Sequence, residues 1–409
     1  MTPSPVVSRT PRASTIPVCP RGGLPGGRRE RGAVLVHVAV AMTGLLAFSA
    51  LTIDLGSLWV ARGQAQNAVD AAALAGAISL AGNPGDPSQA EAAARAIAQA
   101  HSIWGEPVPA GSLTVATGPC PTGSPSIIGE CMTVAVQRGG GVGTPLPVFF
   151  SRLISVTPTS LSAFASAKVM TGNTSTCVRP LAIMDAWRPG SGTWSFDDQF
   201  APPDVYVAPS SSGPGTGHTQ ASLNFRVSLG RGEVQFPVPP AGNEYFNLDI
   251  SRVGSPGTEG DYAQREQRYL DNMATCNAVP VPIGEPVGYW DEGHEQTNAA
   301  AQSIIDSDPG AYWDGSTIRG SAFPVSPRLL TIALVDPQFY LTQQGLPISE
   351  RRYVIRNLVG FFLEQANASV AGLSDPMVGI LLRTNGSFSP SADNVAEESA
   401  FLKNVALVR

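Results

Sequence analysis

Histidine and charge are both scarce in this chain. Its 409 residues include 4 histidines, and Asp, Glu, Lys and Arg together make up 14% of the sequence. General acid–base catalysis uses histidine most often, so the material for that chemistry is thin. The H-E-x-x-H, G-x-S-x-G and phosphate-loop patterns are also absent from the sequence. We therefore expect a protein that is not an enzyme and that binds no cofactor.

Basic residues are too few beyond the N-terminus to form a nucleic-acid footprint. Residues 1–31 hold six arginines against one glutamate, and the rest of the chain is net acidic. A protein that binds phosphate backbones needs a basic stripe, and the only one here precedes an apolar segment. We expect no nucleic-acid partner.

Cysteine is scarce as well, with five residues, and none has the C-x-x-C spacing of a zinc or redox site. Cys19 precedes the apolar segment and the other four follow it. An even set outside the cytoplasm can form two disulfides. Of the three possible pairings, proximity in sequence favours Cys120 with Cys131 and Cys177 with Cys276. Buried free thiols are the alternative.

Two acidic patterns resemble metal sites only superficially. Residues 314–318 (DGSTI) lack the second serine of the D-x-S-x-S loop that a von Willebrand A metal site needs. Residues 291–295 (DEGHE) could offer a few ligands, but their spacing is more typical of a solvated loop. We expect no metal site.

A long apolar segment begins after the arginines. Residues 33–53 are uncharged, and at 1.5 Å per residue a helix of that length reaches roughly 32 Å, about the thickness of a bilayer core. Four arginines lie within about twenty residues before it and one, Arg62, lies after it, so the positive-inside rule places the N-terminus in the cytoplasm. A cleavable signal peptide is the alternative, although its apolar core is usually shorter.

The helical pattern does not stop where the span should end. After Asp54 the chain continues without proline to Gly82, and small or apolar side chains recur at steps of three and four residues. This stripe predicts close packing against another helix. The alternative is that the protein's own globular domain covers it. The stripe consists of Leu51, Leu55, Leu58, Ala65, Val69, Ala72 and Gly76, interrupted by Arg62.

Glycine and proline are abundant, with 43 and 36 residues, and 43% of the chain is apolar. These values favour a large core with many turns, and therefore a β-rich bulk. The predicted organisation is a disordered basic leader (1–31), a transmembrane helix (32–54), extracytoplasmic helices (55–105), an α+β region (106–175) and a larger β-rich extracytoplasmic domain (176–409) with a loop insertion near 188–260.

Periodicity predicts individual elements within these regions. After the long helix we expect a second helix over residues 88–104, strands over 112–117, 131–138 and 159–170, and a short amphipathic helix over 146–154. Residues 171–260 are expected to be mostly loop, with 209–219 a disordered surface excursion. The last third predicts a helix near 297–309 and buried strands over 278–287, 328–336, 351–366 and 377–384.

The segment from residue 28 to 77 resembles the N-terminal region of the TadE/TadG-like proteins of Flp (Tad) pilus assembly, in which a basic leader and a span run into an "xxDxGxLxxxRxxxQNAxDAAALAGA" extension. Weaker likenesses to TadG-type sequences occur at 148–169, 177–187, 276–290 and 308–315. The matching positions in the extension are Asp54, Gly56, Leu58, Arg62, Gln66, Asn67, Asp70 and 71–77.

The resemblance implies an α+β protein with one N-terminal transmembrane helix that continues into a stalk and a pilin-like region. It implies a place in the bacterial inner membrane and partners such as small pseudopilins, an inner-membrane platform or further copies. A surface adhesin that shares the anchor is the alternative. The residues implied to pack in the assembly are Asp54, Gly56, Leu58, Arg62, Ala65, Gln66, Asn67, Val69, Asp70 and Ala72.

Two positions bear on how such a segment would work. Asp54 could pair with a basic group of a neighbouring subunit, or it could be a solvated residue at the membrane surface. Prepilins carry glutamate five positions after the glycine at which they are cleaved, whereas counting from Gly32 places His37 there. Processing and entry into a filament are therefore in question.

Overall fold

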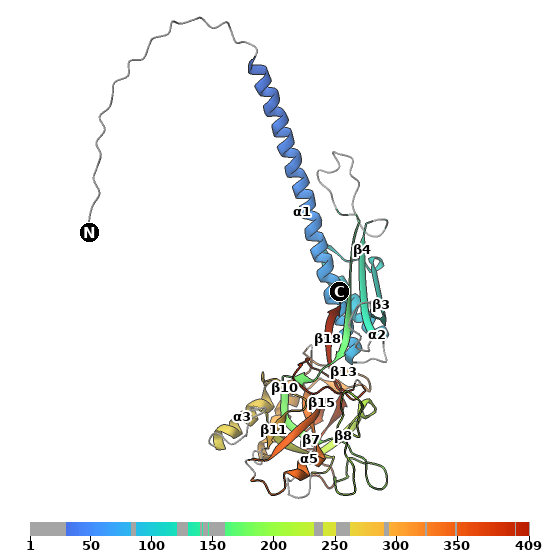
Figure 1. Ribbon diagram of the computed structural model, residues 1–409, viewed down its shortest axis with the longest axis vertical. Helices are drawn as coiled ribbons and strands as arrows, with labels where there is room; N and C mark the ends of the chain where they lie inside the picture. Colours follow the sequence, from blue (N-terminus) through green and yellow to red (C-terminus); the bar gives the residue numbers. More distant parts are fainter. Residues whose placement is uncertain are drawn as a thin grey trace, which may run out of the picture. The chain divides into compact units, whose positions relative to one another are not determined.

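A computed structural model describes residues 30–82, 87–120, 130–139, 141, 146, 160–232, 240–250, 262–289, 294–323, 325–347, 350–396 and 398–408. The fold is mixed, with 31% helix and 33% strand, which confirms the predicted α+β class with an apolar N-terminal helix and a larger β-rich domain (Figure 1). The chain divides into two compact units, one containing α1 up to Ser57 and the other beginning at Leu58.

Helix α1 (Glu30–Gly82) is one continuous element of 53 residues. It persists because residues 30–82 contain no proline, which would remove a backbone hydrogen bond and clash with the preceding turn. The sequence immediately beyond it, N-P-G-D-P, cannot continue a helix. Helix α2 (Pro87–Ala100) follows and is shorter than the predicted 88–104, because residues 102–103 form a short strand instead.

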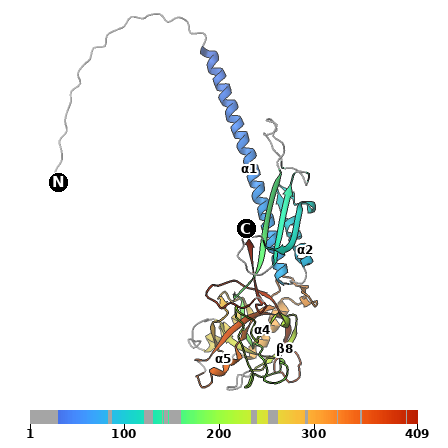
Figure 2. The same cartoon turned by 45° about the vertical axis from the view of Figure 1, so that its right-hand side comes forward.

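A five-stranded sheet in the order β17-β18-β5-β4-β3 packs against the second half of α1 and against α2 (Figure 2). Alternate residues of β3, β4 and β5, among them Val115, Val134 and Ala165, join α1 and α2 in one apolar core. This alternation is what the sequence showed at 112–117, 131–138 and 159–170. The strands are β3 (Leu113–Pro119), β4 (Glu130–Arg138), β5 (Leu161–Thr171), β17 (Thr384–Asn385) and β18 (Leu402–Val408).

A second sheet has the order β11-β15-β14-β7-β9-β8-β16 and closes on itself, because β16 also pairs with β15 and β11 also pairs with β9. Strand β7 is buried along its whole length and β14 along all but its first residue, and the two pair in parallel. The strands are β7 (Val178–Met184), β8 (Arg226–Arg231), β9 (Glu244–Asp249), β11 (Pro286–Tyr289), β14 (Leu329–Val335), β15 (Arg352–Gln365) and β16 (Met377–Leu382).

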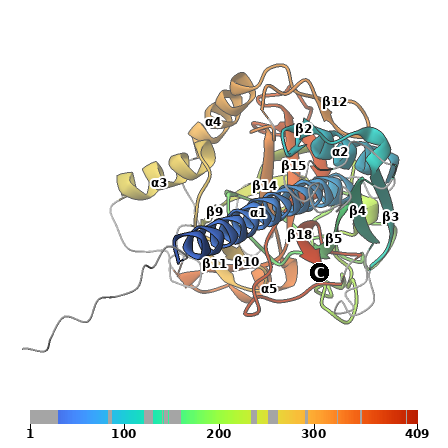
Figure 3. The same cartoon turned by 90° about the horizontal axis from the view of Figure 1, so that it is seen from above.

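Helices α3 (Tyr262–Ala274) and α4 (His294–Ser307) lie against one side of the closed sheet (Figure 3), where Met273 and Ile304 enter its core. Helix α5 (Pro337–Thr342) follows β14 and is capped by Asp336, whose side chain accepts a hydrogen bond from Phe339 N. The remaining elements are short: β1 (Ser102–Ile103), β2 (Glu106–Pro107), η1 (Ala110–Ser112), β6 (Thr174–Ser175), η3 (Gln220–Ser222), β10 (Val281–Pro282), β12 (Tyr312–Trp313) and β13 (Ile318–Arg319).

The closed sheet is inserted between two neighbouring strands of the five-stranded sheet. Strand β5 leads into it, and β18 returns from it to pair with β5 over residues 403–408. Residues 402–408 therefore belong to the same sheet as β3, β4 and β5, and not to the β-rich domain that the predicted boundary of 176–409 assigned to them.

The described part of residues 171–260 is mostly loop, as predicted, but the prediction overlooked three strands. Strands β7, β8 and β9 lie there, and all seven residues of β7 are buried. A strand buried on both faces lacks the alternation that periodicity detects, and in β7 Arg179 and Pro180 also interrupt the apolar run. The expected disordered excursion at 209–219 is wrong at its end, because His218 is 2% exposed.

Other differences are local. The predicted strand 278–287 is two short strands separated by a turn at Gly284, whose φ of 93° favours glycine. Helices α3 and α5 were not predicted. The amphipathic helix expected at 146–154 lies outside the described residues except for Leu146.

Candidate functional site on the N-terminal helix

The first half of α1 exposes its large apolar side chains. Leu35 is 73% exposed, Leu45 70% and Phe48 74%. Val34–Ala81 is long and apolar enough to cross a membrane, and its most apolar window, of mean hydropathy 2.2, is not buried in the protein. An exposed apolar surface of this size marks a contact with lipid or with another protein.

Asp54 interrupts this exposed stretch, because its side chain is buried and only 3% exposed, while Ile53 and Leu55 on either side are about half exposed. A buried carboxylate needs hydrogen-bond or ionic partners. The interpretation of Asp54 as a solvated residue at the membrane surface therefore does not fit the structure.

The second half of α1 buries the small residues of the predicted stripe. Ala65, Val69 and Ala72 are fully buried in the core that α1 shares with α2 and the five-stranded sheet. Of the two alternatives, the one in which the protein's own fold covers the stripe is the one that the structure shows for these three residues. They are not available for packing against another subunit while this core is intact.

Gly76 shows why the stripe has to be small. A Cβ atom placed on Gly76 would lie 2.7 Å from Met132 Cγ and 3.0 Å from Ala94 Cβ. Helix α1 thus approaches both β4 and α2 so closely that only glycine fits at this position. The "AAALAGA" run is explained by packing within the chain.

The other residues of the TadE/TadG-like motif differ in their surroundings. Gln66 Nε2 donates to Asp70 Oδ1 at 2.8 Å and to the Phe164 carbonyl of β5 at 3.1 Å, so this pair fastens α1 to the sheet. In contrast, Gly56, Arg62 and Asn67 are exposed. Leu58 is partly buried at the edge of the core.

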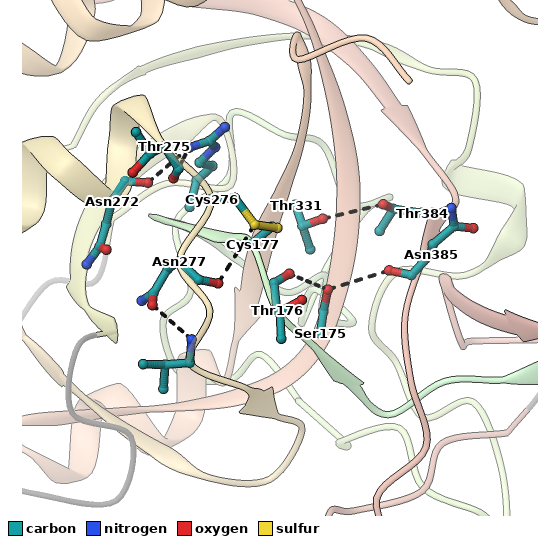
Figure 4. Close-up of a disulfide and its surroundings, with 12 residues drawn as sticks. Ser175, Thr176, Cys177, Asn272, Thr275, Cys276, Asn277, Thr331, Thr384 and Asn385 are labelled. Atoms are coloured by element: carbon teal, nitrogen blue, oxygen red, sulfur yellow. Dashed lines mark hydrogen bonds between the residues drawn. A yellow bond between two sulfur atoms is a disulfide. The ribbon is translucent and has the colours of Figure 1, made fainter. Parts of the chain in front are cut away.

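Both disulfides join the cysteines that proximity favoured. Cys120 and Cys131 connect the end of β3 to β4, with Cα atoms 5.0 Å apart, and Cys177 and Cys276 connect the start of β7 to the segment after α3, with Cα atoms 4.3 Å apart (Figure 4). Arg179 reinforces the second connection, because its guanidinium donates to the carbonyls of Asn272, at 3.2 Å, and Thr275.

The structure also brings together a buried polar cluster that the sequence did not indicate. Asp185 accepts hydrogen bonds from the Tyr206 hydroxyl at 2.8 Å and from the His218 backbone at 2.8 Å, and its carboxylate lies 2.9 Å from His218 Nδ1. Burial and the adjacent Asp185 carboxylate raise the pKa of Tyr206 well above its usual value, so the hydroxyl stays a donor.

This cluster looks at first like part of a catalytic triad. His218 Nε2 has no hydrogen-bond partner among the described residues, and the imidazole is enclosed by Trp194 and Phe196. Nucleophilic catalysis needs a nucleophile within hydrogen-bond reach of the base and access for a substrate. The contacts observed fasten the segment around His218 to the end of β7, which is a structural role.

The two metal-like patterns have different outcomes. Asp314 Oδ1 accepts from the backbone of Ser316 and Thr317, and its Oδ2 from Arg319 Nε, so its carboxylate is engaged in its own turn. Residues 291–293 of the second pattern lie outside the described residues. Among the residues that the structure describes, no three His, Cys, Asp or Glu side chains gather as a metal site would require.

Comparison with known families bears on α1 alone. Residues 32–79 match the family model described as putative Flp pilus-assembly TadE/G-like. The segment is TadE/G-like. This confirms the resemblance that its motif suggested, over both the exposed half of the helix and the buried half. No curated protein and no solved structure matches the chain.

The TadE/G-like segment supports involvement in Flp pilus assembly in general terms, together with the machinery of that process. It also suggests a structural role more than a catalytic one. The weaker likenesses at 148–169, 177–187, 276–290 and 308–315 stay predictions.

Proposed function

We propose that this protein is a membrane-anchored, non-catalytic component of a Flp pilus-assembly apparatus that holds or organises the pilus in the cell envelope. The observation that carries the proposal is the TadE/G-like match at 32–79 on a helix whose first half is exposed and apolar enough to cross a membrane. The sheets then form the body that this helix attaches to the envelope.

The arginines before α1 support an orientation for the anchor. Within about twenty residues of the span, four arginines precede it and only Arg62 follows it, so the N-terminus lies in the cytoplasm and the sheets lie outside the cytoplasm. The helix would then cross the inner membrane of a bacterium. The two disulfides support the same side, since such bonds persist in oxidising compartments.

The partner face is the part of the TadE/G-like segment that the chain's own core leaves exposed. Trp59, Gly63 and Asn67 follow one another at steps of four residues and therefore lie on one face of α1. Trp59 is 78% exposed, and a Cβ atom on Gly63 would meet nothing within 4 Å. An exposed glycine inside a helix costs about 1 kcal/mol relative to alanine. A neighbouring helix, from a small pseudopilin or a second copy, would give that glycine a packing purpose.

Photo-crosslinking in pilus-producing cells tests this face. A photoreactive residue at position 67 should form crosslinks to another pilus-assembly protein or to a second copy, whereas the same group at the exposed Phe388 should not. Gly63→Leu and Trp59→Ala should each lower the crosslink yield and the number of pili several-fold, with membrane levels unchanged. Phe388→Ala is the matched aromatic control. Normal piliation with both variants and no crosslinks would refute the proposed face.

A further inference from the structure

A groove of about 840 Å³ opens beside the first half of β8. It is lined by β8, by the loop that contains Trp194 and Phe196, and by residues 370–373. The groove combines aromatic surface with a few polar groups, which is the usual make-up of a binding site. Its most informative lining residues are Trp194, Phe196, Asp197, Phe225, Ser228 and Asn243.

Strand β8 has a partner on one side only over its first half. It pairs with β16 through residues 226–229 and with β9 only through Gly230 and Arg231. Because β9 begins alongside the end of β8, no strand in the described part of the chain flanks residues 226–229 on the groove side. The groove lies where a further strand would pair with residues 226–229 of β8.

Two hydrogen bonds establish which backbone groups face the groove. Leu381 N donates to the Phe225 carbonyl at 3.0 Å, on the β16 side, and Gly230 N donates to the Asn243 carbonyl at 2.8 Å, on the opposite side. Backbone groups alternate in direction along an antiparallel strand. The N–H and C=O groups of Arg226 and Ser228 therefore point toward the groove, spaced as an incoming strand would need them.

The aromatic wall is tightly packed on one side and open on the other. Phe196 and Phe225 lie nearly parallel, with ring centroids 6.2 Å apart, and Phe225 is 56% exposed. Trp194 and Phe196 also pack against the buried His218 ring, at 5.4 and 5.6 Å, which holds them in place. At the rim, Asn243 Nδ2 donates to Asp197 Oδ1 at 2.8 Å.

We propose that this groove binds an extended peptide segment of another protein, which adds a strand to β8. Its backbone pairs with Arg226 and Ser228, and an aromatic or branched apolar side chain of the peptide packs on Phe196, Phe225 and Trp194. Strand addition of this kind obtains affinity from main-chain hydrogen bonds and specificity from the pocket that receives a side chain. The proposal requires neither the membrane anchor nor the pilus role.

The test is a selection of random octapeptides displayed on phage against the full-length protein in nanodiscs. Ser228→Pro is the variant expected to lose binding, because proline removes a backbone N–H that points into the groove and not toward β16. Ser228→Ala keeps that N–H. Enriched peptides should bind the wild type and Ser228→Ala equally, and Ser228→Pro at least 10-fold more weakly. Phe225→Ala should weaken binding similarly without touching the β8–β16 ladder.

A second measurement uses the wild-type protein alone, in case Ser228→Pro does not fold. N-methylation of alternate residues on one edge of an enriched peptide should abolish binding, and N-methylation of the opposite edge should leave it intact. Equal binding by both methylated forms would overturn the proposal. So would a failure to enrich any peptide, or displacement of the peptides by a soluble chitin oligosaccharide, which would indicate a sugar site.

Discussion

The two halves of α1 are both apolar, yet they meet opposite surroundings. Residues 34–60 expose large side chains such as Leu45 and Phe48, whereas residues 61–81 bury mainly alanine against α2 and the five-stranded sheet. Hydrophobicity alone does not separate these situations. Side-chain size does, because a helix packed closely against protein needs small residues, and a helix that faces lipid has no such limit.

The largest expected effect comes from placing charge in the first half. Leu45→Arg combined with Phe48→Arg should remove the protein from the membrane fraction, since each arginine near the middle of a span costs about 2.5–3.5 kcal/mol on insertion scales. Carbonate extraction of membranes measures this. Asn67→Arg, an exposed position in the second half, is the control and should stay membrane-bound. Retention of the double variant would show that the first half is not the anchor.

An effect of intermediate size on stability should distinguish the buried Gly76 from the exposed Gly63 in α1. Gly76→Val should destabilise the region that contains the five-stranded sheet by about 1–3 kcal/mol, because overpacking forces Met132 and Ala94 apart. Gly63→Val, the same substitution where no neighbouring atom lies within 4 Å, should be neutral or stabilise by a few tenths of a kcal/mol. Urea unfolding of the purified protein in detergent compares them. Equal losses of stability would contradict the distinction between the halves.

The smallest expected effect is a change of Tm with pH, which should come from a buried carboxylate in the closed-sheet region and not from α1. Asp308 is 1% exposed and accepts hydrogen bonds from the hydroxyls of Ser321 and Ser326, both at 2.7 Å. Burial raises the pKa of Asp308, but these bonds, the Ala322 N–H and the nearby Arg328 outweigh it and hold the pKa below its ordinary value of 3.8.

A depressed carboxyl pKa stabilises the fold above the unfolded value, and this contribution disappears as the pH falls through the folded value. The wild type should therefore lose its advantage in Tm over Asp308→Asn when the pH is lowered from 5 to below 3.8. Membrane retention through the first half of α1 should not change over that range. A Tm difference that is independent of pH would contradict this assignment.

Sequence patterns predicted the elements whose environment is one-sided. The second half of α1 and the alternating strands β3, β4 and β5 followed from periodicity, because one face of each meets the core. Strand β7 escaped detection because both of its faces are buried and Pro180 interrupts it. The closure of the second sheet rests on β16 pairing with both β8 and β15, which no local pattern encodes.

The candidate site on α1 was only partly predictable from the sequence. Spacing identified Ala65, Val69 and Ala72 as one helical face, but it could not say what covers that face, and the answer is the protein's own core. Nor could it find the contact between Asp185 and His218, which lie 33 residues apart on either side of a Gly/Pro-rich loop. The exposed Trp59, Gly63 and Asn67 became distinguishable only once their neighbours were known.

The paired passage between the two sheets has a mechanical consequence. Strand β5 runs out toward the closed sheet beside β18 running back, joined by six residue pairs from Lys403 with Thr171 to Val408 with Ser166, and Gly172 N continues the bonding to the Leu402 carbonyl at 2.9 Å. Two domains joined by one linker can rotate about it. Here two hydrogen-bonded strands, β5 and β18, join the two sheets, so a rotation would have to break the hydrogen bonds between them. A pulling force or a torque on the closed sheet is therefore shared by several hydrogen bonds at the same time.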